Sequence, residues 1–251
     1  MLMEVAMFRW YALAIAALVL VQSPAWALPS PLDTLQDAYD VMDELEDIPS
    51  KGIPPKLLSE AQAIAIIPRV VKAGFIIGGR GGHGVVLTKD ANGQWGNPTF
   101  VNLGGASFGF QAGVQSTDVV LLFRHKKTLE RVLEGRRKIT LGADASIAAG
   151  PVGRQAEAGT DLRLQSEILS YSRSRGLFAG VALDGAMIGH DERANSAYDR
   201  YQSPELKRAL SDLQKKITSM SGTPDNGPQT IPPIGNDPSK PAPKPSNDLP
   251  K

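Results

Sequence analysis

Two glycine-rich motifs have the spacing of loops that bind nucleotides or carry a catalytic serine. Residues 79–84 (GRGGHG) fit the pattern GxGxxG, and residues 105–109 (GASFG) fit GxSxG with Ser107 at the nucleophile position. Each motif works only where a turn leads from a strand into a helix. Residues 85–88 and 108–114, which follow the motifs, have the composition or alternation of strands instead. The sequence therefore favours glycine-rich strand segments over a nucleotide site or an esterase.

The remaining polar motif does not indicate a metal site or a catalytic triad. His190, Asp191 and Glu192 are consecutive, and consecutive side chains cannot all face one ion or one nucleophile. The chain has no cysteine, which excludes disulfides, thiolate chemistry and cysteine-bound zinc. We therefore expect no enzymatic activity, no metal and no cofactor, and a loop here that leads into a helix starting near Glu192.

Basic side chains are the candidate binding groups that remain. The formal net charge of +1 argues against nucleic-acid binding, which needs a strongly basic surface. Each Lys or Arg near an anionic membrane contributes about 1 kcal/mol, so a face with several bases would hold lipid weakly. Bases gather in residues 51–80 and 124–138, although they could also be ordinary surface charges. The predicted lipid-binding residues are Lys126, Lys127, Arg131, Arg136, Arg137, Lys56, Arg69, Lys72 and Arg80.

The N-terminal segment has the features of a secretory signal peptide. Arg9 is followed by an apolar run over residues 10–21, then by Pro24 and the small-x-small sequence of residues 25–27. The run is shorter than the roughly twenty residues that span a bilayer. We predict cleavage after Ala27 and a periplasmic or secreted protein, with peripheral membrane association as an option.

Apolar spacings of three and four predict several helices. Residues 32–48 have one apolar face and one acidic face that contains no base, and residues 56–63 form a second, short helix. A helix over residues 126–134 ends at Gly135. Ser203, followed by proline and glutamate, caps the start of a C-terminal amphipathic helix.

Short segments rich in Ile, Val and Gly predict the strands. These are residues 64–67, 74–77, 84–88, 108–114, 119–123, 143–148, 161–164 and 177–187, with a hairpin turn at 90–93. The fold class is therefore α+β: a bent antiparallel sheet or partly closed β-barrel, flanked by N-terminal helices and a C-terminal helix. From Gly222 onward, nine of thirty residues are proline and none is aromatic, which predicts disorder. The predicted organisation is a signal peptide (1–27), a domain (28–221) and a proline-rich tail (222–251).

Five sequence blocks together resemble the SYLF family. They are residues 72–75, then 79–82 with 84–87 and 93–95, then 104–113, 149–154 and 171–180, and the resemblance extends over roughly residues 32–201. It implies a lipid-binding module without catalysis; eukaryotic members bind phosphoinositides, and yeast relatives also bind actin. One departure is the acidic helix at residues 32–48, which an anionic bilayer would repel, so we expect it to pack on the domain.

The function expected from these observations is that of an exported, non-enzymatic module that binds anionic lipid or membrane surfaces. The alternative is a structural or interaction protein of the cell envelope, tethered by its proline-rich tail. Actin is a partner that the resemblance implies, although an exported protein meets cytoplasmic actin only inside a host.

Overall fold

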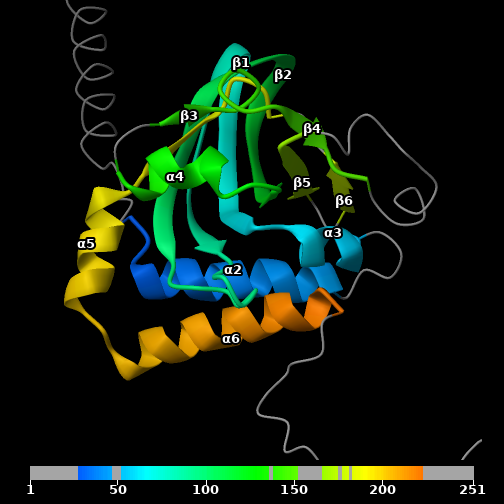
Figure 1. Cartoon of the computed structure of the whole chain (residues 1–251). Coiled ribbons are helices and arrows are strands. Elements are labelled where there is room, and N and C mark those ends of the chain that lie inside the picture. Colours follow the sequence, from blue (N-terminus) through cyan, green and yellow to red (C-terminus); the bar gives the residue numbers. More distant parts are fainter. Residues whose placement is uncertain are drawn as a thin grey trace, which may run out of the picture.

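The computed structural model describes residues 28–46, 52–135, 138–151, 166–174, 177–180 and 183–222. The predicted signal peptide, the predicted strand at 161–164 and the tail from residue 223 lie outside the described residues. Within these ranges the structure is a curled sheet with helices on both faces (Figure 1). The predicted α+β class is confirmed.

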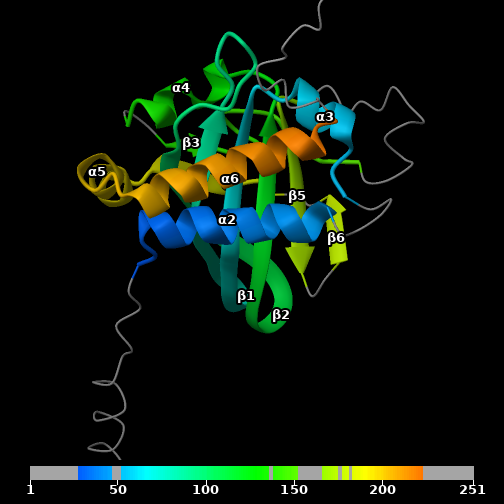
Figure 2. The same ribbon diagram turned by 90° about the horizontal axis from the view of Figure 1, so that it is seen from below.

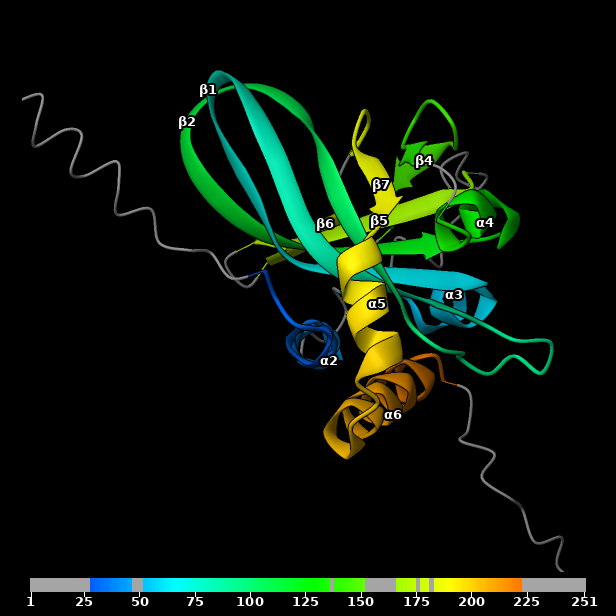
Figure 3. The same ribbon diagram turned by 90° about the vertical axis from the view of Figure 1, so that its left-hand side faces the viewer.

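Two long strands form the centre of the sheet. β1 (Ala63–Thr88) pairs with β2 (Thr99–Phe123) in antiparallel register, from Val86 opposite Thr99 at the turn to Ala63 opposite Phe123. The two-stranded ribbon curls back on itself, so the first and last parts of β1 lie side by side (Figure 3). The amide of Lys89 donates to the carbonyl oxygen of Gln62 at 2.9 Å and closes this contact.

Shorter strands extend the sheet along the edge of β2 that does not pair with β1. β7 (Met187–His190) pairs with the beginning of β2, and β3 (Ile139–Thr140) pairs with β7. β5 (Ile168–Ser174) pairs with the end of β2 and carries β4 (Ile147–Ala149) in parallel and β6 (Leu177–Gly180) antiparallel. The result is a strongly bent, mostly antiparallel sheet.

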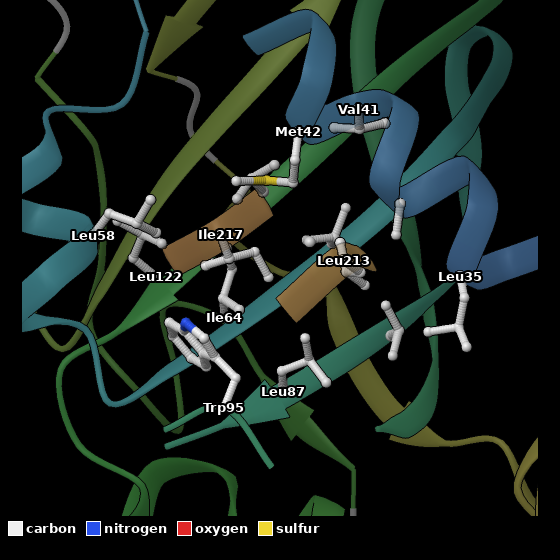
Figure 4. Packing of buried hydrophobic residues seen from close by; sticks show 14 of the residues in the cluster. Leu35, Val41, Met42, Leu58, Ile64, Leu87, Trp95, Leu122, Leu213 and Ile217 are labelled. Atoms are coloured by element: carbon white, nitrogen blue, oxygen red, sulfur yellow. The ribbon is translucent and has the colours of Figure 1, made fainter. Parts of the chain in front are cut away.

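Two parallel helices cover one face of the sheet (Figure 2). α2 (Pro31–Glu46) and α6 (Pro204–Met220) lie side by side, and α3 (Pro55–Glu60) closes the end of this layer. Their apolar faces meet the sheet in one buried cluster (Figure 4), which includes Leu35, Met42, Ile64, Leu122, Leu213 and Ile217. The expected packing of the acidic helix on the domain is thus confirmed.

A second cluster fills the opposite face of the sheet. α4 (Lys127–Leu133) buries Leu129 and Val132 against Phe123 and Ile188. α5 (Glu192–Arg200) links β7 to α6, and its Tyr198 belongs to the first cluster, with its ring 5.6 Å from the ring of Phe100. Residues from alternate positions of β1 and β2 enter the two clusters in turn, as expected for a sheet that is buried on both faces.

The predicted ends of the helices agree with the structure in two places. Gly135 follows α4 with a φ of 67°, and the side chain of Ser203 accepts from the amide of Leu206 at the start of α6. The predicted helix at 56–63 ends earlier, at Glu60, because Ala63 already begins β1.

Several predicted strands have different bounds in the structure. The three predicted strands at 64–67, 74–77 and 84–88 belong to the single strand β1. The predicted strand at 143–148 is wrong over most of its length, since Gly142 donates to the carbonyl of Ala145 across a turn and only β4 is extended. The predicted strand at 177–187 is two strands, with a turn at Gly185 (φ 75°) before β7.

Candidate ligand-binding surfaces

Arg69 lies at a bulge in β1 and is neutralised by α2. Its guanidinium pairs with both carboxylate oxygens of Asp37, and its amide donates to Asp118 Oδ1 at 2.9 Å. The hydrogen bond with Asp37 is the main reason that the pKa of Arg69 is raised, because the bond favours the charged form. Its φ of 48° is held by these contacts. The Arg69 guanidinium is therefore already paired with a carboxylate, so it is a poor candidate for binding a lipid phosphate.

The other bases of the first predicted cluster do not form one face. Lys56 lies on α3 and is 4.0 Å from Glu60, while Lys72 and Arg80 lie on the curled part of β1. Figures 1 and 3 show α3 and this part of β1 well apart. Arg80 is half-buried; its Nη2 donates to the carbonyl of Ala106 at 3.4 Å, and its Nε is buried without a partner among the described residues.

The second predicted cluster surrounds α4. Lys126 immediately precedes the helix, Lys127 begins it and is exposed, and Arg131 lies in its middle. Arg136 and Arg137 lie outside the described residues. Among the described residues, no salt bridge joins Lys126 or Lys127 to a carboxylate. The pKa of Asp90 is lowered mainly by its hydrogen bonds with the backbone of Gln94 and Asn92, and the nearby charge of Lys126 adds a smaller contribution.

The acidic face of α2 is paired with bases from distant parts of the chain. Glu44 pairs with Arg173 of β5, and Asp43 and Glu46 both pair with Lys216 of α6. Burial opposes the charge on Lys216, but the hydrogen bonds with the two carboxylates outweigh it and raise the pKa of Lys216. Asp118, whose role was not predicted, holds both Arg69 and Arg173, the latter at 2.8 Å. No local sequence signal reveals these pairs.

A cleft lies between α2 and the curled ribbon, which we call the α2 cleft. Its larger part has a volume of about 710 Å³, and a second part of about 400 Å³ continues it. The two parts share Asp37, Pro68, Arg69 and Ser116. The larger part is also lined by Asp33 and Thr34 of α2 and by Gly81, His83 and Asn102 of the ribbon. This is where the helical layer ends and the glycine-rich sheet is uncovered.

The motifs that resembled catalytic loops lie in strands, as predicted. Residues 79–84 are followed by the end of β1, and Ser107 lies within β2. Asp191 caps α5 by accepting from the amide of Ala194 at 3.0 Å, and its Oδ2 is 3.3 Å from His83 Nδ1. The helix expected near Glu192 is confirmed, and no group of three potential metal ligands occurs in the described parts of the chain. None of the described helices is both long and apolar enough to cross a membrane.

Comparisons with known proteins identify the family. Residues 104–218 match the family model described as "Ysc84: Las17-binding protein actin regulator". The SH3 domain-containing YSC84-like protein 1 of Homo sapiens is 34% identical over 68% of this chain and 51% of its own length. The same protein of Xenopus laevis is 34% identical over 60% of this chain and 44% of its own length. Protein YSC84 of Saccharomyces cerevisiae is 38% identical over 58% of this chain and 31% of its own length.

The chain spans about half the length, or less, of the curated relatives it matches. No solved structure matches it. The matched region begins within β2 and ends within α6, so it covers the end of the central ribbon and the elements after it. The resemblance derived from the sequence blocks is therefore confirmed, and the chain carries a domain of the Ysc84, or SYLF, family.

Proposed function

We propose that this domain is a non-enzymatic module that binds anionic lipid surfaces reversibly, in a protein exported through the segment at residues 1–27. The observation that carries the proposal is the contrast between the basic residues. Arg69, Arg173 and Lys216 are held by carboxylates, whereas Lys126 and Lys127 have no salt bridge to a described carboxylate. Because Lys126 and Lys127 are not paired with a described carboxylate, their ammonium groups can bind a lipid phosphate without first breaking a salt bridge.

The position of α4 adds to this contrast. α4 packs on the face of the sheet opposite to α2 and α6, so the acidic face of α2 does not share its surface (Figure 2). Lys138, just before β3, is exposed, and its stem passes over Gly189 of the neighbouring strand. A membrane that meets the α4 face would therefore contact bases while the carboxylates of α2 point elsewhere.

The test is a liposome flotation series with increasing anionic lipid content. Replacing Lys126, Lys127 and Arg131 by Gln should weaken binding by about 1 kcal/mol for each base, because each loses its attraction to lipid phosphate. Binding of the parent should also weaken as salt rises, since screening shortens to about 8 Å at physiological ionic strength.

A matched control removes the same charge from the other face. Lys207, Arg208 and Lys215 are exposed on α6, and their replacement by Gln should leave flotation unchanged. The proposal fails if the α4 variant floats as well as the parent, or if both triple variants lose binding equally. Equal loss in both variants would show that liposome binding depends on the net charge of the protein and not on the α4 face.

Protein–protein interaction is the second candidate, favoured because the matching family is described as a Las17-binding actin regulator. It includes both actin binding and the role of an envelope scaffold tethered by the proline-rich tail. A protein with either of these roles would not bind liposomes at any anionic lipid content. Co-sedimentation of the parent with filamentous actin, together with failure to float, would favour this candidate over lipid binding.

A further inference from the structure

We propose that the α2 cleft binds an aliphatic amine, and that an elongated polyamine fits it best. This proposal goes beyond the proposed function and does not depend on it, because the cleft and α4 lie on opposite faces of the sheet. Three properties of the cleft lead to this class of ligand: its charge, its shape and the hydrogen-bonding groups along it.

The charge of the cleft is negative. Its two parts are lined by the carboxylates of Asp33, Asp37, Asp40, Glu44 and Asp118 against the guanidinium groups of Arg69 and Arg173. Both arginines are already held by carboxylates of the cleft. An anionic ligand would thus meet a surplus of carboxylates, with both lining arginines already paired, whereas an ammonium group would be attracted.

The shape of the cleft suits a slender chain. Gly81 contributes no side chain to the floor, and a Cβ at this position would have only the carbonyl oxygen of Leu103 nearby, at 3.9 Å. Val71, Leu103, Pro29 and Pro68 add apolar lining. Because the two parts share four residues, the cleft is longer than a compact ligand needs. Methylene groups can lie along the bare backbone here.

Hydrogen-bond acceptors are present toward both ends. Asp33 belongs to the larger part of the cleft, and Asp40 and Glu44 to the smaller part. Asn102 supplies an independent observation: it lines the larger part, and its Oδ1 is buried without a partner among the described residues. A rotation of this amide would cost Oδ1 no hydrogen bond and would offer an acceptor to an ammonium group.

Isothermal titration of spermidine into the full mature chain at low salt tests the proposal. Asp37→Asn removes a carboxylate and also releases the guanidinium of Arg69 into the cleft, so affinity should fall by about tenfold or more. Asp37→Glu should restore most of it. Asp199→Asn, an exposed charge change on α5, is the matched control and should bind as the parent does.

A second pair of variants tests the shape without changing the charge. Gly81→Leu should fill the floor of the cleft and abolish binding, while the domain keeps its melting temperature. Gly79 lies on the same strand and is exposed, but it does not line the cleft. A Cβ added at Gly79 would meet no atom within 4 Å. Gly79→Leu should therefore bind spermidine normally.

Three outcomes decide the matter. Binding of spermidine that depends on Asp37 and Gly81 supports a free polyamine as the ligand. Binding that depends on Asp37, but only to vesicles containing ethanolamine lipid, supports the same ammonium chemistry with a lipid headgroup as its source. The proposal is overturned if neither probe binds, if glutarate binds as well as spermidine, or if Asp37→Asn and Gly81→Leu leave binding unchanged.

Discussion

Individual glycines in the ribbon have opposite surroundings although their sequence context is similar. A Cβ built at Gly84 would lie 2.4 Å from the carbonyl oxygen of Ile66 and 2.8 Å from Cα of Ile67, where the curled β1 passes next to itself. A Cβ built at Gly104 meets nothing within 4 Å. Neither glycine has a positive φ. The requirement at Gly84 is therefore one of space and not of backbone conformation.

This difference predicts opposite outcomes for the same substitution. Gly84→Ala should destabilise the domain by about 1–3 kcal/mol, because the methyl group must push two segments of β1 apart. Gly104→Ala should leave the stability unchanged or raise it slightly, since alanine reduces the freedom of the unfolded chain. Urea unfolding of the two variants measures both effects, and equal midpoints would contradict the packing described for Gly84.

At the scale of elements, α2 is fixed at its start by a reciprocal cap. The Ser30 hydroxyl donates to Asp33 Oδ2 at 2.7 Å, the Ser30 amide donates to the same oxygen at 3.1 Å, and the Asp33 amide donates to the Ser30 hydroxyl at 3.2 Å. These hydrogen bonds, first that from the side chain, lower the pKa of Asp33 from its ordinary value of 3.8. The ionised carboxylate is thus favoured in the folded state.

Because of this cap, the free energy of unfolding should fall in acid. Because the folded pKa lies below the unfolded value, the contribution of Asp33 is complete above pH 3.8 and is lost as pH falls through the lower, folded pKa. Asp33→Asn cannot titrate. The difference in melting temperature between parent and variant should therefore be constant from pH 6 to about pH 5 and should shrink below pH 3.8. A difference that grows in acid would contradict this.

Elements with a strong local signal were predictable from the sequence, and elements defined by distant partners were not. The apolar periodicity of α2 and α6 and the stop at Gly135 are local features. β5 was missed because only three of its seven residues, Ile168, Leu169 and Tyr171, are apolar, although Ser170 is buried as well. β1 was divided into three because its glycines and Pro68 look like breaks, whereas they accommodate the curl.

The candidate sites show the same limit. Composition revealed the bases around α4, but nothing near Arg69 in the sequence shows that Asp37, thirty-two residues away, neutralises it. The α2 cleft likewise depends on residues from α2, both halves of the ribbon and β5. Sequence patterns could supply the acidic helix and the glycine-rich strands, but only the curl of the ribbon brings them together.

At the scale of the whole molecule, the buried side chains of the described ranges lie between residues 34 and 221. The first buried side chain is that of Thr34 in α2, and the last is that of Ser221, followed by Gly222 with a φ of 67°. We therefore predict that removal of residues 1–27 leaves the described fold intact.

The corresponding prediction concerns the mature N-terminus. N-terminal sequencing of the protein recovered after export should begin at or near Leu28, because residues 25–27 have the small-x-small pattern that signal peptidase cleaves. The cleaved and uncleaved forms should have the same melting temperature within about a degree, since every buried residue of the described ranges lies after residue 27. A soluble mature form that still begins at Met1 or Met7 would contradict export.

The register of the long ribbon also has a consequence for how the chain folds. Val86 and Thr99 meet across a short turn, but Ala63 and Phe123 are sixty residues apart in sequence. Contacts between distant residues form late, because closing a large loop costs entropy before any contact repays it. We expect the turn at residues 90–93 to form first, with the ribbon zipping away from it. Until the last pairs close, only the part of the surface around Val85, Leu87 and Phe100 is available to α2, so we expect the acidic helix to complete its packing late in the folding reaction.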